Sequence, residues 1–195
     1  MAQPPSPLPL TQPSRSRGDF STLFVLEALV QQGLLAPAQA QDVLAREGPA
    51  RARVLKAKGA TGKEAARYEV SPVEIVAAFQ VALPEGRGLL DEDRVTEAAA
   101  RAAGCAYRKI DPLKVDMHLS TRTVSRPFAQ KHAILPLERD EGGRLVVAVA
   151  NPFDRELFAN LQQLAGCSTP SMRRRTRLAS RLGSMWMSEA RLSYA

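Results

Sequence analysis

The sequence predicts an α+β fold: a helical N-terminal subdomain followed by a small α/β subdomain with a short, mainly antiparallel sheet packed by helices. Two observations predict this class. Residues 20–81 carry apolar side chains at helical spacing, interrupted by helix caps and glycine stops. Residues 134–154, ILPLERDEGGRLVVAVANPFD, have the pattern of a strand, a glycine turn, a second strand and the start of a helix.

The first helices are predicted from their apolar spacing and from their end signals. Apolar residues over 20–30 fit one helix, and Gly33 suits its end. Pro37 is tolerated in the first turn of a helix, so a second helix begins there. Residues 51–68 are basic and weakly periodic, which favours a third short helix followed by a loop.

The next helix has a complete start signal. Ser71 is placed to cap it, Pro72 suits its first position and Glu74 completes a capping box. Val73, Val76 and Phe79 follow as its apolar stripe. A proline- and glycine-containing linker, residues 82–89, comes after it.

A further helix starts at a cap on Asp91 and ends at Gly104. Residues 105–110 suit a short strand, and residues 125–132 a brief helix. Both precede the hairpin.

Three features of the hairpin predict its place in the sheet. Pro136 cannot donate to a ladder, so its strand lies at an edge or ends early. Residues 145–150, LVVAVA, are apolar on both faces, which predicts a strand buried on both. Glu141-Gly142-Gly143 forms the turn between them, and Asp154 caps the helix that follows.

Composition divides the chain into four parts. Residues 1–18 form a proline-rich leader expected to be disordered, residues 19–84 the helical subdomain, and residues 85–167 the α/β domain. Residues 168–195 are a basic tail, expected to be disordered or aberrant. The net charge is +7, and the tail alone carries six arginines against one glutamate. The body is therefore nearly neutral, and we expect no nucleic-acid-binding face on it.

No catalytic, cofactor or metal site is predicted. The segment GATGKE, residues 59–64, lacks a phosphate-binding loop because Ala57 replaces its first glycine and Glu64 its hydroxyl residue. His118 and His132 have no ligand pattern around them, so surface or capping roles are expected. Cys105 and Cys167 are expected to be reduced, partly buried thiols.

Targeting features are also missing from the pattern. No apolar run approaches the roughly 20 residues that cross a bilayer, and the proline-rich start has no export signal. A cytoplasmic protein is expected.

Residues 90–167 resemble the N-terminal domain of the type II secretion assembly ATPase, general secretion pathway protein E, and its type IV pilus relatives. An alanine-rich helix, an Asp-Pro-Leu turn at 111–113 and FAQKHAILPL at 128–137 carry the resemblance. The glycine hairpin and VAVANPFD at 147–154 complete it. Residues 20–81 look like the leading helical subdomain of that family.

The resemblance implies a docking role without catalysis. Such a domain would link the cytoplasmic motor domain of the full-length ATPase to the cytoplasmic domain of an inner-membrane platform protein. It would be cytoplasmic, and peripheral to the inner membrane through its partners, with no direct insertion. The residues of the docking surface are not indicated: exposed candidates such as Glu27, Gln31 and Gln32 do not differ from a solvated helix face.

Two departures from the family leave alternatives open. No Walker motif follows, so this chain alone should not hydrolyse ATP. Some relatives bind cyclic di-GMP through a motif resembling R-L-G-x-x-L-V-x-x-G. Here FVLEALVQQG, residues 24–33, has Phe24 where the arginine would stand. A cyclic-di-GMP-sensing module of the same fold is one alternative, and a binder of nucleic acid or lipid through the basic tail is another.

The tail breaks the family pattern. After LAGC a valine-rich strand and a helix are expected, but the sequence continues SMRRRTRLASRLGSMWMSEARLSYA. A truncated or frame-shifted reading end would produce this break, and a basic amphipathic tail is the rival explanation. The missing strand would leave a sheet edge exposed.

Overall fold

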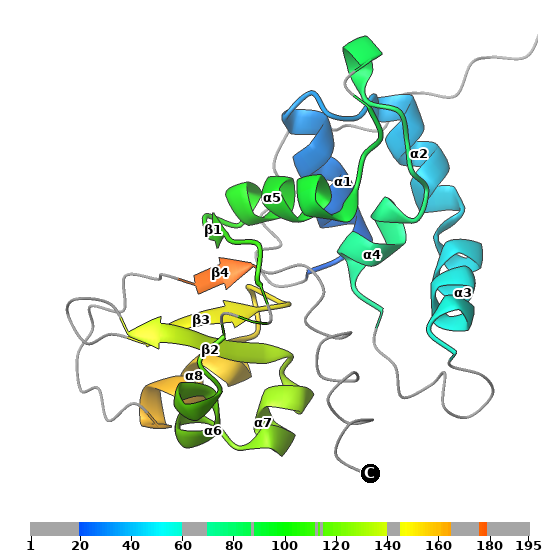
Figure 1. Ribbon diagram of the computed structural model, residues 1–195. Helices are drawn as coiled ribbons and strands as arrows, with labels where there is room; N and C mark the ends of the chain where they lie inside the picture. Colours follow the sequence, from blue (N-terminus) through cyan, green and yellow to red (C-terminus); the bar gives the residue numbers. More distant parts are fainter. Residues whose placement is uncertain are drawn as a thin grey trace, which may run out of the picture.

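The computed structural model describes residues 20–59, 70–86, 88–111, 113, 115–139, 145–164 and 176–178 of the chain. Helices α1–α4 form one lobe, the sheet with α6–α8 forms the other, and α5 lies between them (Figure 1). The helices are α1 (Thr22–Gln31), α2 (Pro37–Ala45), α3 (Glu47–Ala57), α4 (Pro72–Ala77), α5 (Glu92–Ala102), α6 (Met117–Thr123), α7 (Arg126–Lys131) and α8 (Arg155–Leu164). The strands are β1 (Ala106–Tyr107), β2 (Ile134–Arg139), β3 (Leu145–Val149) and β4 (Thr176–Leu178). The α+β class is confirmed.

The predicted helix starts are confirmed by their hydrogen bonds. The Asp91 carboxylate accepts the Arg94 N–H at 2.8 Å, and the Asp154 carboxylate accepts the Leu157 N–H at 2.9 Å. In the capping box, Ser71 Oγ accepts the Val73 N–H at 3.3 Å while Glu74 Oε2 accepts the Ser71 N–H at 3.2 Å. Each bond satisfies a backbone group that the first helical turn leaves without a partner.

Two predicted helix ends are also confirmed. Gly33 and Gly104 follow α1 and α5 with φ of 67° and 70°, the left-handed conformation that glycine adopts without strain. The third helix, α3, begins at Glu47, earlier than the basic segment that predicts it. The loop expected after it lies mostly outside the described residues.

The sheet has the order β1-β4-β3-β2. Strands β2 and β3 pair antiparallel, with Ile134 opposite Val149 and a register shift between Pro136 and Glu138. The edge position that Pro136 predicts is therefore confirmed for β2. Residues 140–144, which include the expected glycine turn, lie outside the described residues.

Strand β4 corrects the expectation of a missing strand. It pairs in parallel with β3 on one side and with β1 on the other, so it closes the gap between them. The sequence Thr-Arg-Leu has no apolar run to reveal it, whereas the ladder is made by backbone groups that any sequence supplies. The rest of 168–195 and the whole leader 1–18 lie outside the described residues.

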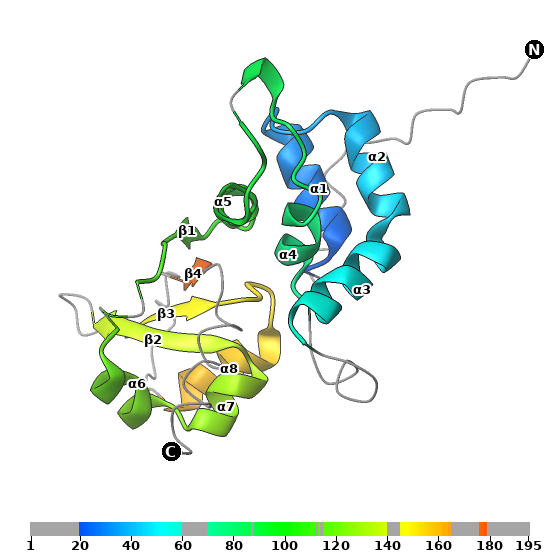
Figure 2. The ribbon, with the colours of Figure 1, turned by 45° about the vertical axis from the view of Figure 1, so that its right-hand side comes forward.

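Both faces of β3 are buried, as predicted. Val147 and Val149 belong to the main apolar cluster, while Ala148 packs with Leu135 in a second cluster. The main cluster also takes in Val25 of α1, Val95 of α5 and Leu157 of α8. Apolar packing therefore passes from the helical lobe through α5 to the sheet; Figure 2 shows α5 end-on between them. The boundary expected near residue 85 stays a prediction.

Candidate docking surface

The joint between α2 and α3 positions a basic side chain at the surface. Arg46 is both the C-cap of α2 and the N-cap of α3, with φ −104° and ψ 15°. Glu47, the next residue, accepts the Thr22 hydroxyl of α1 at 2.7 Å, which fixes the start of α3. The exposed Arg46 guanidinium forms an ion pair with Asp42 one turn earlier.

The other end of α3 is fastened to α4. Lys58 Nζ lies 2.7 Å from Glu74 Oε1, and both side chains are largely buried, at 26% and 19% exposed. Since Glu74 also belongs to the capping box of α4, one carboxylate serves both the cap and the contact between helices. Both ends of α3 are therefore fixed.

Phe79 lies between these two fixed ends. It follows α4, is half-buried and packs against two apolar clusters. The guanidinium carbons of Arg46 and Arg53 lie 5.4 and 5.9 Å from its ring centroid, within the range of a cation–π interaction. These side chains, together with Gln39, Asp42 and Val81, line a pocket of about 330 Å³.

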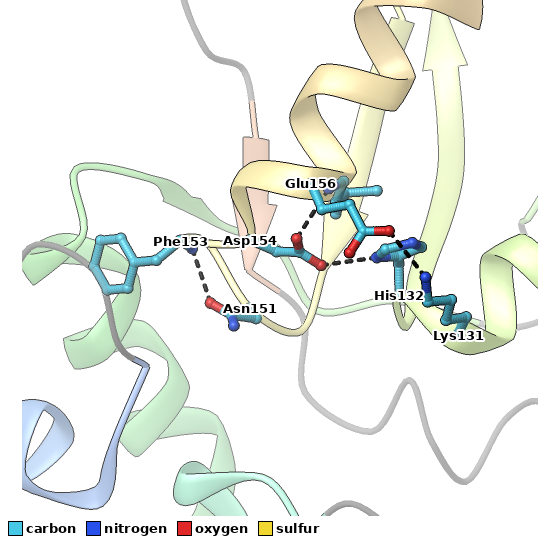
Figure 3. Close-up of polar contacts among 7 residues, drawn as sticks. Lys131, His132, Asn151, Phe153, Asp154 and Glu156 are labelled. Atoms are coloured by element: carbon cyan, nitrogen blue, oxygen red, sulfur yellow. Dashed lines mark hydrogen bonds and ion pairs between the residues drawn. The ribbon is translucent and has the colours of Figure 1, made fainter.

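A second polar cluster joins α7 to α8 (Figure 3). His132 Nδ1 lies 2.8 Å from Asp154 Oδ2, and Lys131 Nζ lies 2.9 Å from Glu156 Oε1. Because a carboxylate only accepts, Nδ1 of His132 is the donor. The other ring nitrogen, Nε2, is buried and has no hydrogen-bond partner among the residues that the structure describes.

The pKa of the Asp154 carboxyl lies below its usual value of 3.8. Partial burial acts to raise this pKa. The hydrogen bonds from the Leu157 N–H, His132 and the Glu156 N–H, together with the charge of His132, lower it by more than burial raises it. Asp154 is therefore ionised at neutral pH, and its carboxylate accepts the N–H groups at the start of α8. The cluster stabilises the α7–α8 junction, and its contacts are those of a structural fastening.

Comparison with protein-family models finds a match in the second half of the chain. Residues 103–185 match the family model of the MshEN domain. This segment is therefore similar to the MshEN domain. The matched segment contains all four strands and helices α6–α8. MshEN is the N-terminal domain of type II secretion and type IV pilus assembly ATPases, and is distinct from their catalytic core.

The MshEN match confirms the resemblance deduced from the sequence and reaches beyond residue 167, where that resemblance ended. No curated protein matches the chain. The pocket at Phe79 lies outside the matched residues, on α2–α4 and the turn after them.

The residues considered as exposed candidates on α1 differ in their contacts. Gln32 donates to the Ala98 carbonyl at 2.8 Å and accepts from Arg101 at 3.1 Å, so it joins α1 to α5. Gln31 is exposed and Glu27 partly exposed. Phe24, at the position of the cyclic-di-GMP arginine, packs its ring against Phe20 and Phe153.

The two histidines differ in exposure, and only one of the two cysteines is described. His118 is exposed, as expected. His132 is only 8% exposed, so a surface role is wrong for it; its contact with the capping residue Asp154 spans 22 residues and has no local sequence signal. Cys105 is a half-buried thiol that is not in a disulfide, and Cys167 lies outside the described residues.

The described residues contain no group of three or more His, Cys, Asp or Glu side chains that could hold a metal ion. Within the same ranges, no helix combines the length and the apolar character needed to span a bilayer.

Sequence reasoning missed Arg46, Arg53 and Phe79 as a group. The two arginines are seven residues apart, about two helical turns, which was the available signal that they share one side. Phe79 was instead assigned to the apolar stripe of α4. It follows the capping residue Ala78 and is therefore outside that helix.

Proposed function

We propose that this chain is a docking domain of a type II secretion or related pilus-assembly ATPase. It would link the motor domain of the full-length ATPase to the cytoplasmic domain of an inner-membrane platform protein. The observation that carries the proposal is the MshEN match over the sheet and its helices. In this reading the hairpin, β4 and α8 form a scaffold whose exposed surfaces meet other proteins.

The proposal includes a location and a set of partners. The domain would be cytoplasmic and held at the inner membrane through protein contacts, without inserting into the bilayer and without binding nucleic acid. The near-neutral charge outside residues 168–195 supports this, because a neutral body has little non-specific attraction for lipid or nucleic acid.

A binding measurement tests the docking role. The purified chain is immobilised and titrated with the cytoplasmic domain of the platform protein from the same secretion system. We expect saturable binding that an unrelated cytoplasmic protein of similar size and charge does not show. Retention no greater than that of the unrelated protein would overturn the proposal.

We also propose that the chain alone turns over no nucleotide. Incubation with ATP and Mg²⁺ should release no phosphate above a protein-free blank, while a full-length secretion ATPase in the same assay gives the positive signal. Release that scales with the concentration of the chain, and that survives repurification, would contradict this.

Cyclic-di-GMP sensing is the alternative within the same fold. The aromatic packing of Phe24, which stands at the arginine position of the motif, disfavours it. Calorimetric titration separates the two functions: flat heats at high micromolar cyclic di-GMP support docking alone, and a saturable exotherm or endotherm supports sensing.

Binding of nucleic acid or lipid through the basic tail is the less favoured alternative. Because β4 belongs to the sheet, the test should replace Arg173, Arg174 and Arg175 by glutamine rather than delete the tail. If the tail binds DNA or anionic vesicles, these replacements should weaken that binding and reduce its salt dependence.

A further inference from the structure

The cations near Phe79 exceed the acidic groups available to them. Helix α3 and the two residues that cap it carry Arg46, Arg51, Arg53, Lys56 and Lys58. Lys58 is neutralised by Glu74, and Arg46 by the exposed Asp42. In the part of the chain that the structure describes, no acidic side chain pairs with Arg53. Among the described residues, the surface beside the pocket therefore carries more positive than negative charge.

Cation–π contact prepares the two guanidinium groups for a carboxylate. Arg46 and Arg53 both lie near the Phe79 ring, whose position is set by its packing against the two apolar clusters. A guanidinium held in this way loses less side-chain entropy when it binds, and its planar set of N–H donors matches a carboxylate. The two like charges share one ring, so an anion between them would also relieve their repulsion.

The pocket adds an apolar surface to this charge. Val43, Phe79 and Val81 contribute to its lining, and its volume of about 330 Å³ is enough for an apolar side chain. A flat membrane surface would gain nothing from such a recess, whereas a peptide can insert a side chain into it. Charge and shape together therefore favour a protein segment over anionic lipid.

We propose that the pocket around Phe79, flanked by Arg46 and Arg53, receives an acidic segment of the partner protein. A carboxylate of that segment binds the two guanidinium groups, and a neighbouring apolar side chain packs against Phe79. In the free chain Arg46 forms its ion pair with Asp42. On binding, the carboxylate of the partner replaces Asp42 in that ion pair. This inference rests on the proposed docking function for the identity of the partner, but the pocket itself can be tested independently.

The first experiment uses the complete chain and an acidic probe peptide that contains two glutamates and one phenylalanine. NMR titration of the isotope-labelled chain should shift the side-chain signals of Arg46 and Arg53 and the backbone signals of α2 and α3. The same peptide with glutamines in place of glutamates should cause at least several-fold weaker shifts. Equal responses to both peptides, or shifts confined to other elements, would overturn the inference.

The second experiment measures binding of the platform protein's cytoplasmic domain to three variants and one control. Arg46→Gln and Arg53→Gln should each weaken binding roughly tenfold, in line with the loss of a charge-assisted contact. Asp42→Asn should strengthen it several-fold because Arg46 is released. Arg122→Gln, an equally exposed arginine on α6, should leave it unchanged.

The outcomes separate this inference from the docking function. Platform binding that none of the three variants changes would leave docking standing and overturn the pocket. Peptide binding at the pocket without platform binding would support the pocket and count against docking. Loss of binding to phosphatidylglycerol vesicles in the arginine variants, with platform binding intact, would assign the surface to lipid and overturn the inference. Circular dichroism of each variant is the control that checks whether the variant is folded.

Discussion

The ring of Phe153 meets the ring of Phe24 edge to face, with centroids 5.1 Å apart and planes at 89°. Phe24 lies in α1 of the helical lobe, and Phe153 lies in the turn between β3 and α8. In Figure 3, Phe153 points away from Asp154, its neighbour in the turn, and from His132 at the end of α7. The Asn151 side chain accepts the Phe153 N–H at 2.8 Å and so fixes the turn that presents this ring.

We expect Phe153→Ala to lower the free energy of unfolding by about 2 kcal/mol, roughly half the cost of deleting a fully buried phenylalanine, because the ring is half-buried. Urea denaturation of the whole chain measures it. Phe153→Leu keeps much of the apolar contact and should cost less. Equal stability of the alanine variant and the wild type would show that the ring contact contributes nothing.

The pH dependence of stability should include Asp154. Its pKa in the folded state lies below 3.8, so the charged carboxylate stabilises the fold above that value. This contribution is lost as the pH falls through the lowered pKa. Asp154→Ala should therefore cost about 1 kcal/mol at neutral pH, the usual effect of losing a helix cap, and less near pH 3.

Denaturation of both proteins between pH 6 and pH 3 measures this difference. Asp154→Asn serves as the control, since asparagine can cap a helix without a charge. A difference that grows as the pH falls would contradict the assignment.

Removing the hydroxyl of Ser120 should lower the stability of the fold by weakening the contact between α6 and the edge strand β2. Ser120 Oγ lies 3.0 Å from the Pro136 carbonyl of β2, and Ser120 is only 3% exposed. The single hydroxyl proton is shared between this carbonyl and the Asp116 carbonyl, also 3.0 Å away, and its loss in Ser120→Ala should cost about 1–2 kcal/mol. Thr121→Ala is the matched control, because that exposed hydroxyl bonds only within its own helix. Thermal unfolding distinguishes them, and similar losses in both variants would argue against the contact with β2.

The ion pair between α3 and α4 should matter more than an exposed one. Glu74→Gln keeps an acceptor for the Ser71 N–H but removes the charge beside Lys58, and we expect a loss of about 1 kcal/mol. Glu97→Gln breaks the exposed pair with Arg101 and should cost no more than about 0.5 kcal/mol. The two variants are compared by urea denaturation, with and without 0.5 M salt. A larger loss at Glu97 would invert the ranking that burial predicts.

Local signals in the sequence predicted much of the fold. Ser71, Asp91 and Asp154 were identified as caps because a helix start needs a side-chain acceptor within three residues. Pro136 predicted an edge strand because its missing N–H would break a central ladder. Each of these features depends on residues that are adjacent in the sequence, so the sequence alone is enough to predict it.

Features that depend on distant contacts escaped the same reasoning. The segment of α6, Met-His-Leu-Ser-Thr-Arg-Thr, has little helical periodicity; it is fixed by the Asp116 cap and by the contact of Ser120 with β2. Strand β4 is placed by backbone pairing with β1 and β3, which are distant in the sequence.

The candidate site shows the same limit. The arginine spacing was visible in the sequence, but the approach of Phe79 to both guanidinium groups depends on how α4 packs against α3. No local pattern encodes that packing, so the pocket could be recognised only after the three segments were placed in space.

One continuous apolar cluster runs from α1 through α5 to β3 and α8, so the two lobes share a hydrophobic core. A load applied to the first helices would reach the strands directly, without first being taken up by a hinge. We therefore expect the two lobes to move together, so that a partner bound to one lobe is mechanically coupled to whatever holds the other.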